Sequence, residues 1–268
     1  MPTFSANLGF LWTEIPLADA IVCAKRAGFD AVECHFPYDE PIDDVKAALK
    51  ETSLPMLGIN TIKGQGGAGL SALPGHESTA REAIDQAFAY GIEIGAFNVH
   101  VMAGKAEGEE AERTYLHNLN YAANLANNAQ MTVLIEPLNA FDMPNYFLRN
   151  TSHAIDLIEK LSNENIKLMF DCYHVGRTEG NVIGRFNACL SYIGHIQFAS
   201  VPDRREPDQG TLDYAEVFRV IDESGWSTPL GAEYKPASRT DQSLDWMQTL
   251  PIQKKYILET KNAHRDTR

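Results

Sequence analysis

Apolar residues recur at helical spacing in successive stretches of the chain, and short apolar runs lie between these stretches. In the first stretch, apolar residues at 17, 20, 21 and 24 follow the i, i+3, i+4, i+7 pattern of an amphipathic helix. Pro16 suits the first turn of that helix, and Gly28 suits its end. The same spacing predicts helices near 41–51, 80–88 (ending before Gly91), 109–128, 151–161, 181–190, 214–221 (ending before Gly225) and 240–250.

The runs between these helices are short and rich in apolar or β-branched residues, which is typical of strands. They lie near 4–8, 29–34, 55–60, 95–102, 131–136, 166–171, 193–198 and 229–233. Strands that alternate with helices of this length pair in parallel through crossover helices. Eight such units predict closure into a (β/α)₈ TIM barrel. The alternative is an open doubly wound sheet, but no G-x-G-x-x-G motif follows the first strand.

Length, charge and cysteine usage narrow the classes of protein and partner. The 268 residues are close to the roughly 250 of a typical eight-fold barrel, and no linker divides them, so we expect one catalytic domain over residues 1–268. A formal charge of −13 without a basic stripe argues against nucleic acid and anionic membranes as partners. Four scattered cysteines, no signal-peptide pattern and no run of 18 apolar residues predict a cytoplasmic protein with reduced thiols that does not span a membrane.

Polar residues stand at the carboxyl ends of the predicted strands, where the active site of a TIM barrel lies. They are Asn7, His35, Asn60, His100, Glu136, Asp171, Gln197 and Glu233. If these groups served stability alone, each would need its own hydrogen-bond partner, at a cost of roughly 1–3 kcal/mol for each group left unpaired. Convergence on one shared site is the simpler interpretation.

The last four of these residues form the strongest candidate site. Glu136, Asp171, Gln197 and Glu233 would supply three carboxylates and one amide oxygen to a common centre. Hard oxygen ligands of this kind suit Mg²⁺ or Mn²⁺ rather than zinc or copper. Without a cation the three carboxylates would repel one another and raise at least one pKa sharply. Each residue alone could be a salt-bridged strand end, but together they predict a site for one divalent metal ion.

Four further residues are candidates for binding an anionic substrate beside the metal. His174 lies three residues beyond Asp171, on a predicted loop, where it can hydrogen-bond a substrate oxygen or orient Asp171. Arg204 and Lys235 bring positive charge to the ends of the last two strands, and a guanidinium matches a carboxylate in a fork. His100 lies in the dense segment NVHVMAG. The alternatives are solvated surface charge for the two cations and a structural hydrogen bond for His100.

Longer motifs run through these positions. They include FSANLGFLWTE at 4–14, FPYDE at 36–40, GLSALPG at 69–75, IEPLNAFDMP at 135–144, DCYH at 171–174, HIQFASVPDRREPDQG at 195–210 and EYKP at 233–236. With these motifs the chain resembles, nearly from end to end, the hydroxypyruvate isomerase family, a branch of the xylose-isomerase-like TIM barrel superfamily. The segment NVHVMAG is more similar to the related 2-oxo-tetronate isomerases.

The resemblance implies a metal-dependent isomerase of the aldose–ketose type, acting on a small anionic sugar acid. Hydroxypyruvate and tartronate semialdehyde would interconvert by proton transfer through an enediolate, whose negative charge the metal stabilises. The family scheme implies that Glu136 and Glu233 transfer the proton and that Asp171 and Gln197 complete the metal site. The superfamily usually has a histidine in place of Gln197. No redox cofactor is needed, and a homodimer is usual among the relatives.

Other functions stay open on the sequence. With the same metal site the chain could isomerise a 2-oxo-tetronate or epimerise a ketose at C3. The superfamily also contains metal nucleases, which usually have more metal-binding histidines and a basic DNA-binding face. A non-catalytic sugar-acid binding protein is a further alternative, and the intact Glu136 and Glu233 argue against it. The glycine-rich loop at 63–78 is either a lid or binding loop, as long loops often are, or a flexible connection.

Overall fold

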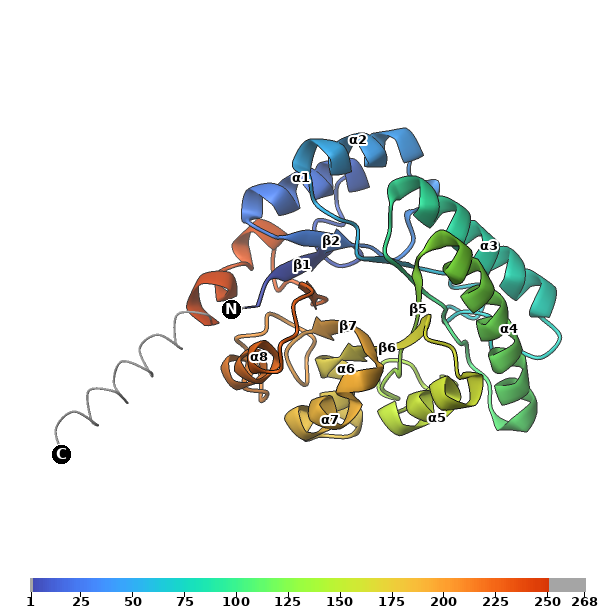
Figure 1. Ribbon diagram of the computed structural model, residues 1–268. Coiled ribbons are helices and arrows are strands. Elements are labelled where there is room, and N and C mark those ends of the chain that lie inside the picture. The colour runs from blue at the N-terminus through green and yellow to red at the C-terminus, as the bar shows by residue number, and fades with distance from the viewer. Residues whose placement is uncertain (1, 251–268) are drawn as a thin grey trace, which may run out of the picture.

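In the computed structural model, which describes residues 2–250, eight parallel strands form the centre and the helices surround them (Figure 1). The strands are β1 (Phe4–Asn7), β2 (Ala31–Glu33), β3 (Gly58–Asn60), β4 (Asn98–His100), β5 (Thr132–Ile135), β6 (Ile166–Asp171), β7 (Ile193–Phe198) and β8 (Leu230–Ala232). Each lies within a run that the sequence predicts, so the (β/α)₈ barrel is confirmed.

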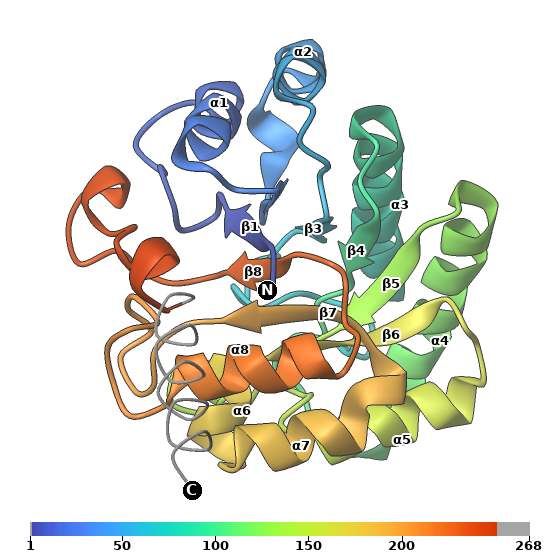
Figure 2. The same cartoon turned by 60° about the vertical axis from the view of Figure 1, so that its left-hand side comes forward.

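The barrel closes between β2 and β3. The order of hydrogen-bonded strands is β2-β1-β8-β7-β6-β5-β4-β3, and Figure 2 shows β8 between β1 and β7. Across the remaining seam, the backbone N–H of Leu57 donates to the carbonyl of Val32 (2.7 Å), and that of Asn60 donates to the carbonyl of His35 (2.8 Å). Because all strands run parallel around a closed seam, their carboxyl ends meet at one rim.

The helices follow the predicted periodic stretches, with one extension and one addition. They are α1 (Leu17–Ala27), α2 (Ile42–Thr52), α3 (Glu77–Ile94), α4 (Gly108–Ala129), α5 (Thr151–Leu161), α6 (Cys172–Thr178), α7 (Val182–Cys189) and α8 (Tyr214–Glu223), with 3-10 turns η1 (Pro37–Asp39), η2 (Leu190–Tyr192) and η3 (Thr240–Gln242). The predicted helix at 240–250 is a 3-10 turn followed by a helical stretch at 246–250, the end of the described range. Residues 251–268 of the predicted domain lie outside that range.

The predicted helix end at Gly91 is wrong. α3 continues to Ile94 and ends at Gly95, whose φ of 67° is left-handed. A Cβ at Gly91 would lie 3.0 Å from Cε of Met131 and 3.4 Å from Cδ1 of Ile59. Gly91 therefore allows α3 to pack closely against its neighbours, and this packing offsets the cost of about 1 kcal/mol of a glycine inside a helix.

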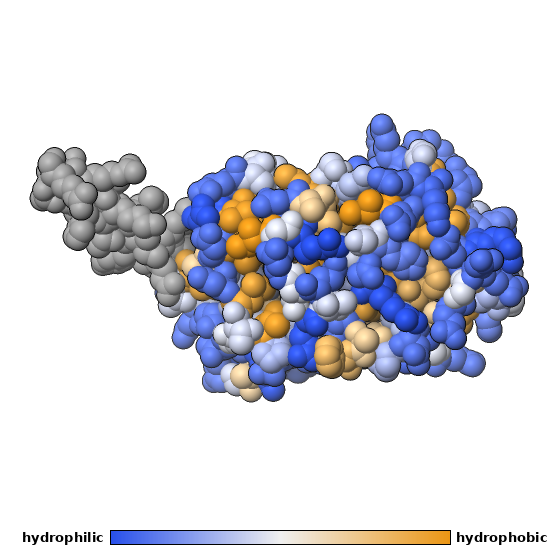
Figure 3. All heavy atoms as spheres, turned by 90° about the horizontal axis from the view of Figure 1, so that it is seen from below, coloured by the Kyte–Doolittle hydropathy of each residue, from blue (hydrophilic) through white to orange (hydrophobic). Residues whose placement is uncertain are grey.

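The hydrophobic core fills the space between the barrel and its helices. On one side, Phe4 of β1 and Phe198 of β7 pack with Phe218 of α8 and with Trp246, at ring-centroid distances of 5.0–5.7 Å. Figure 3 shows a face on which hydrophobic patches are broken up by hydrophilic residues. No helix within residues 2–250 is both long and apolar enough to cross a membrane. The aromatic packing joins β1 and β7, and these strands carry Asn7 and Gln197.

Candidate metal and active site

The predicted strand-end residues gather at one end of the barrel, around a cavity of about 210 Å³. The candidates that line it directly are His35, Asn60, His100, Glu136, His174, Arg204 and Glu233. Asn7 and Gln197 line the barrel interior next to it. Sites for drug-sized ligands typically measure roughly 300–1,000 Å³, so this cavity favours a smaller ligand.

A buried cluster in this region can hold a metal ion. Glu136, Asp171, His174 and Glu233 each offer one ligand atom, and these atoms all lie within 4.8 Å of one another. Gln197 is the register partner of Asp171 on the neighbouring strand. The structure therefore brings together the predicted acidic ligands, places Gln197 beside them and adds His174 to the cluster.

Three of the four predicted ligands carry an unpaired buried oxygen. Within the described part of the chain, Oε1 of Glu136, Oδ2 of Asp171 and Oε1 of Gln197 have no hydrogen-bond partner. An unpaired buried polar group costs roughly 1–3 kcal/mol, and a hard divalent cation binds oxygen atoms of this kind. These oxygens fit the metal site that the sequence predicts.

The two carboxylate oxygens of Asp171 have different surroundings. It is the last residue of β6 and the N-cap of α6, and its Oδ1 accepts a hydrogen bond from the backbone N–H of Tyr173 (2.8 Å). Its Oδ2 is left for the cluster. The sequence reading missed α6 because its seven residues lack the apolar spacing of a helix. His174, predicted on a loop, lies in the first turn of this helix.

The hydrogen bonds of His174 determine which ring nitrogen carries the proton. Its Nδ1 accepts from the backbone N–H of Asn139 (2.9 Å), and the side-chain amide of Asn139 lies 2.8 Å from the same atom. Burial, reinforced by the charge of Arg204, lowers the pKa of His174 to about 3, so the ring is neutral. A neutral ring that accepts at Nδ1 carries its proton on Nε2. Nε2 points into the cluster, 3.6 Å from Oδ2 of Asp171, so His174 is poised as a donor rather than as a metal ligand.

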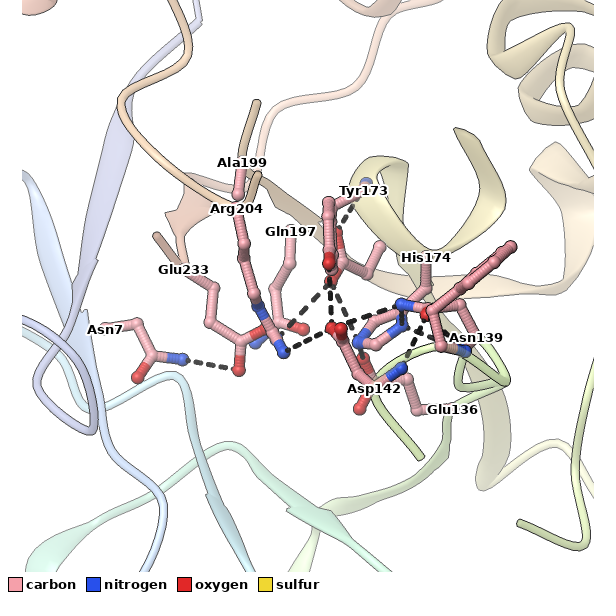
Figure 4. A network of polar contacts seen from close by, with 12 residues as sticks. Asn7, Glu136, Asn139, Asp142, Tyr173, His174, Gln197, Ala199, Arg204 and Glu233 are labelled. Carbon is pink, nitrogen blue, oxygen red and sulfur yellow. Dashed lines mark hydrogen bonds and ion pairs between the residues drawn. The ribbon is translucent and has the colours of Figure 1, made fainter. Parts of the chain in front are cut away.

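Arg204 brings a largely buried positive charge to the same cluster. Its guanidinium pairs with Glu233 and lies 3.7 Å from Oδ2 of Asp142 (Figure 4). Oδ2 of Asp171 lies 3.8 Å from the same guanidinium. It also lies over the ring of Phe10, 4.8 Å from the centroid. The predicted cation is therefore inside the site, where it is held from several sides.

The backbone of Arg204 is fixed as firmly as its side chain. Its φ of 54° is left-handed, a conformation that costs a residue with a side chain of order 1–3 kcal/mol. Its N–H donates to the carbonyl of Ser200 (2.9 Å), and its carbonyl accepts from the N–H of Lys235 (2.7 Å). These bonds join the loop after β7 to the end of β8 and hold Arg204 over the cluster.

The three carboxylates of the cluster differ in how easily they ionise. Burial raises the pKa of Glu136 well above its usual range, and the charges of Glu233 and Asp171 raise it further. Burial and the charge of Glu233 raise the pKa of Asp171 to about 8. For Glu233, burial is outweighed by Arg204 and His35, so its pKa lies below its usual range. Arg204 thus offsets burial fully at Glu233, with which it pairs closely, but only partly at Asp171 and Glu136.

Residues from the first half of the barrel contact these ligands. Nε2 of His35 lies 2.8 Å from Oε1 of Glu233, and the amide of Asn7 donates to the same oxygen (3.2 Å). Nδ1 of His100 lies 3.6 Å from Oε2 of Glu136, and burial lowers the pKa of His100 to about 3. His35 and Asn7 therefore hold Glu233 in place, and His100 faces Glu136 as a neutral ring.

Two lysines lie at different distances from the cavity. Lys235 is exposed, with its Nζ 5.8 Å from the centroid of Phe10, and it is not among the residues that line the cavity. Lys63, from the glycine-rich loop, does line it, with its Nζ 4.6 Å from the centroid of Phe36. Binding of substrate by Lys235 stays a prediction, and Lys63 is a cation that the sequence reading did not select.

The glycine-rich loop at 63–78 is anchored at its centre. Gly69 forms an antiparallel bridge with Ala103, and its φ of 99° is left-handed. A Cβ at Gly69 would lie 2.4 Å from the backbone carbonyl oxygen of Met102, so only glycine fits there. This close approach places Lys63 and Gly67 on the cavity wall.

The sequence did not predict several residues around the site, most of which lie beyond the strand ends. Asn139, Asp142 and Tyr173 are joined by hydrogen bonds, with Oδ2 of Asp142 accepting from Tyr173 (2.8 Å) and from Asn139 (3.2 Å). Glu33 lies inside the barrel on β2. The available signal for the first three was the motifs IEPLNAFDMP and DCYH, which contain them.

Comparisons with known proteins show which family the chain resembles. The model of the xylose isomerase-like TIM barrel family matches residues 22–250. The chain is similar to a 2-oxo-tetronate isomerase of Cupriavidus necator, 39% identical over 255 residues that cover 92% of this chain and 98% of the relative. It is also similar to the hydroxypyruvate isomerase of Escherichia coli, 34% identical with coverages of 92% and 98%. Among solved structures, an AP endonuclease, family 2, from Brucella melitensis matches with a TM-score of 0.89 and 34% identity, covering 92% of this chain and 98% of the other.

Proposed function

The chain belongs to the xylose isomerase-like TIM barrel family, and we propose that it is an isomerase of small oxo acids. The first candidate reaction interconverts hydroxypyruvate and tartronate semialdehyde by proton transfer through an enediolate. The observation that carries this proposal is the buried cluster that contains Glu136, Asp171 and Glu233, with Gln197 beside Asp171 on the neighbouring strand. Three of these four residues have an unpaired oxygen within the described part of the chain.

We propose that this centre takes one Mg²⁺ or Mn²⁺ ion. Its carboxylate and amide oxygens match the preference of hard cations, and the pKa values of Glu136 and Asp171 stay raised despite the charge of Arg204, so a further cation would favour their ionised forms. Glu136, Asp171, Gln197 and Glu233 would hold the ion. When bound, the metal stabilises the negative charge that develops on two adjacent substrate oxygens.

The two glutamates are placed to move the proton. Glu136 follows β5 and Glu233 follows β8, strands that are not neighbours in the sheet, so their carboxylates reach a substrate from different sides. A carboxylate that uses one oxygen as a ligand keeps its second oxygen for a proton. One glutamate would take the proton from one carbon, and the other would deliver a proton to the next carbon.

Two further groups would hold the substrate in place. His174 presents its Nε2–H to the cluster and can donate to a substrate oxygen. Arg204 supplies a guanidinium that can bind a carboxylate with two hydrogen bonds, and it already lies at the cavity. We propose both as substrate-binding residues, with His100 and Lys235 as the remaining candidates.

A 2-oxo-tetronate is the second candidate substrate. The relative from Cupriavidus necator named for this reaction is 39% identical, against 34% for the hydroxypyruvate isomerase of Escherichia coli. A ketose 3-epimerase would use the same centre. DNA is not proposed as a substrate despite the resemblance to an AP endonuclease, because the formal charge of −13 opposes binding to a polyanion.

The state of the cysteines bears on where the enzyme works. Cys23, Cys34, Cys172 and Cys189 are free, and all but Cys23 are buried. We propose a cytoplasmic enzyme with one catalytic domain, and we keep the homodimer as a prediction for sedimentation analysis.

A substrate panel tests the proposal. Metal-stripped protein would be assayed with hydroxypyruvate, a 2-oxo-tetronate and a C3-epimerisable ketose, each with added Mg²⁺, Mn²⁺ or Co²⁺. We expect turnover of an oxo acid that depends on added metal. Binding of these compounds without turnover under every condition would show a binding protein instead.

A further inference from the structure

The barrel interior holds a buried carboxylate that the proposed reaction does not use. Glu33, the last residue of β2, is 3% exposed. Its Oε1 accepts from the amide of Gln197 (2.7 Å) and from that of Asn7 (3.0 Å), and its Oε2 lies 2.8 Å from Nε2 of His195. Within residues 2–250, its ion-pairing partner is this histidine, and no lysine or arginine pairs with it. Burial of a carboxylate is unfavourable unless it is hydrogen-bonded. Three donors surround that of Glu33, and one of them belongs to Gln197, a candidate metal ligand.

The contact with Glu33 determines which way the amide of Gln197 points. A carboxylate oxygen can only accept from the NH₂ group of an amide, since an amide oxygen facing it would be repelled. Nε2 of Gln197 must therefore face Glu33, and Oε1 must face away from it. That Oε1 is buried and has no hydrogen-bond partner among the described residues. The orientation is fixed by chemistry rather than by a free choice between two similar rotamers.

The neighbouring strand leaves room for this contact. Gly231 of β8 is the register partner of Gln197. A Cβ at Gly231 would lie 2.5 Å from Oε1 of Glu33, 2.7 Å from its Oε2 and 2.9 Å from Cγ of Gln197. A side chain at this position would push the carboxylate and the amide apart. Gly231 is thus an independent sign that the fold accommodates the Glu33–Gln197 contact.

We propose that Glu33 is a positioning residue, which holds the amide of Gln197 with its oxygen directed at the metal site. Asn7 and His195 hold Glu33 in turn. This inference rests on the proposed function, because it assigns the role of Glu33 through the metal site. The amide oxygen is the one uncharged ligand of the set, so it gains most from a fixed orientation and from an N–H···carboxylate bond that draws electron density towards the oxygen.

Metal binding by two Glu33 variants tests the proposal without relying on turnover. In E33Q the new amide can donate as well as accept, so Gln197 becomes free to turn its oxygen inward. In E33D the charge stays, but the shorter side chain no longer reaches Nε2. Mn²⁺ affinity of metal-stripped protein would be measured by calorimetry. We expect both variants to bind Mn²⁺ roughly 10–100-fold more weakly than the unaltered protein, the usual loss for an outer partner of a metal ligand.

A double-mutant cycle separates positioning from other effects. Q197A removes the ligand, so E33Q should cause no further loss of Mn²⁺ affinity in the Q197A background. E179Q is the matched control, because Glu179 is also a largely buried carboxylate that accepts from Thr151 and pairs with Arg185, away from the cluster. E179Q should keep the Mn²⁺ affinity of the unaltered protein. Thermal unfolding of every variant confirms that the protein measured is folded.

Three results would overturn the assignment while leaving the proposed function in place. They are unchanged Mn²⁺ affinity in both E33Q and E33D, an undiminished effect of E33Q in the Q197A background, and a loss in E33Q that E33D does not share. The last result would show that Glu33 acts through its charge alone. If the unaltered protein itself binds no Mn²⁺, the metal site of the proposed function fails first, and Glu33 loses this role with it.

Discussion

The two halves of the barrel contribute to the site in different ways. Each of the last four strands has one predicted metal ligand at or next to its carboxyl end, namely Glu136, Asp171, Gln197 and Glu233. Three of the first four strands, β1, β2 and β4, supply or precede residues that contact those candidate ligands, namely Asn7, Glu33, His35 and His100. The second half therefore carries the candidate ligand oxygens together with Arg204, and the first half adds hydrogen-bond partners that hold them in position.

This difference explains why the two halves are not equally visible in the sequence. The ligands belong to short segments in which a carboxylate directly follows an apolar strand, such as TVLIE and KLMFD. The contacts from the first half join residues far apart in the chain: 226 positions separate Asn7 from Glu233, and 164 separate Glu33 from Gln197. Such pairs meet only after the barrel has closed.

Among changes to the second half of the barrel, substitution of Glu136 or Glu233 should lower kcat the most. E136Q and E233Q keep the shape of the side chain and remove the base, so we expect kcat to fall roughly 10²–10⁴-fold at saturating metal. Steady-state kinetics with hydroxypyruvate measures this, with E179Q as the control. A near-normal kcat in either variant would remove that residue from proton transfer.

Turnover in D₂O should place deuterium on a carbon atom of the product, because a proton held by a carboxylate exchanges with solvent. Product without solvent deuterium would favour a direct hydride shift.

Metal affinity gives the next largest effect. D171A removes a hard ligand atom, and we expect Mn²⁺ to bind more weakly than in a variant of an outer partner, for which the loss is roughly 10–100-fold. Calorimetric titration of metal-stripped protein measures the difference. Unchanged affinity would show that the four-residue site is wrongly drawn, even if the variant had lost activity.

The strand-end ligands and the barrel were predictable because each depends on local sequence. Periodic apolar residues predicted the helices, and the polar strand ends predicted the candidate ligands that the fold brings together. The proton of His174 was not predictable, since it depends on the backbone N–H of Asn139 across the site. Glu33 was not predictable either, because in the run at 29–34 it reads as an ordinary strand residue. Its role depends on which side chains share one layer of the closed barrel.

Charge selection by Arg204 should give an effect of about tenfold. A lost charge-assisted contact is worth roughly 1.5–3 kcal/mol, so R204A should raise KM for hydroxypyruvate about tenfold or more. Arg204 also pairs with Glu233. Because R204A breaks this pair, we expect it to lower kcat for every substrate. The measurement is therefore the ratio of KM changes for the acid and for a neutral ketose. Equal changes for both would place the guanidinium away from the substrate carboxylate.

The raised pKa of Asp171 predicts how pH affects the metal-free protein. Its pKa is about 8 in the folded state against an ordinary value of 3.8, so the folded protein binds more protons than the unfolded chain between these values. The free energy of unfolding then falls as pH rises from about 4 to about 8. D171N keeps an oxygen to cap α6 and cannot ionise, so its Tm should fall less over this range. Thermal unfolding of metal-stripped protein from pH 5 to 8 measures this, and parallel curves for the two proteins would contradict the raised pKa.

The two lysines give the smallest expected effect and test whether the first half also contributes charge to substrate binding. Lys63 lines the cavity and Lys235 does not, although both are exposed. An exposed ion pair is worth about 0.2–1 kcal/mol, so K63M should raise KM for hydroxypyruvate by up to about fivefold, and K235M should raise it less. Salt screens exposed charges, so the effect of K63M should shrink between low and high ionic strength, whereas that of R204A should persist because its guanidinium is largely buried. If K235M has the larger effect, the substrate carboxylate points to the outer side of Phe10, and the first half contributes contacts to the ligands but no charge to the substrate.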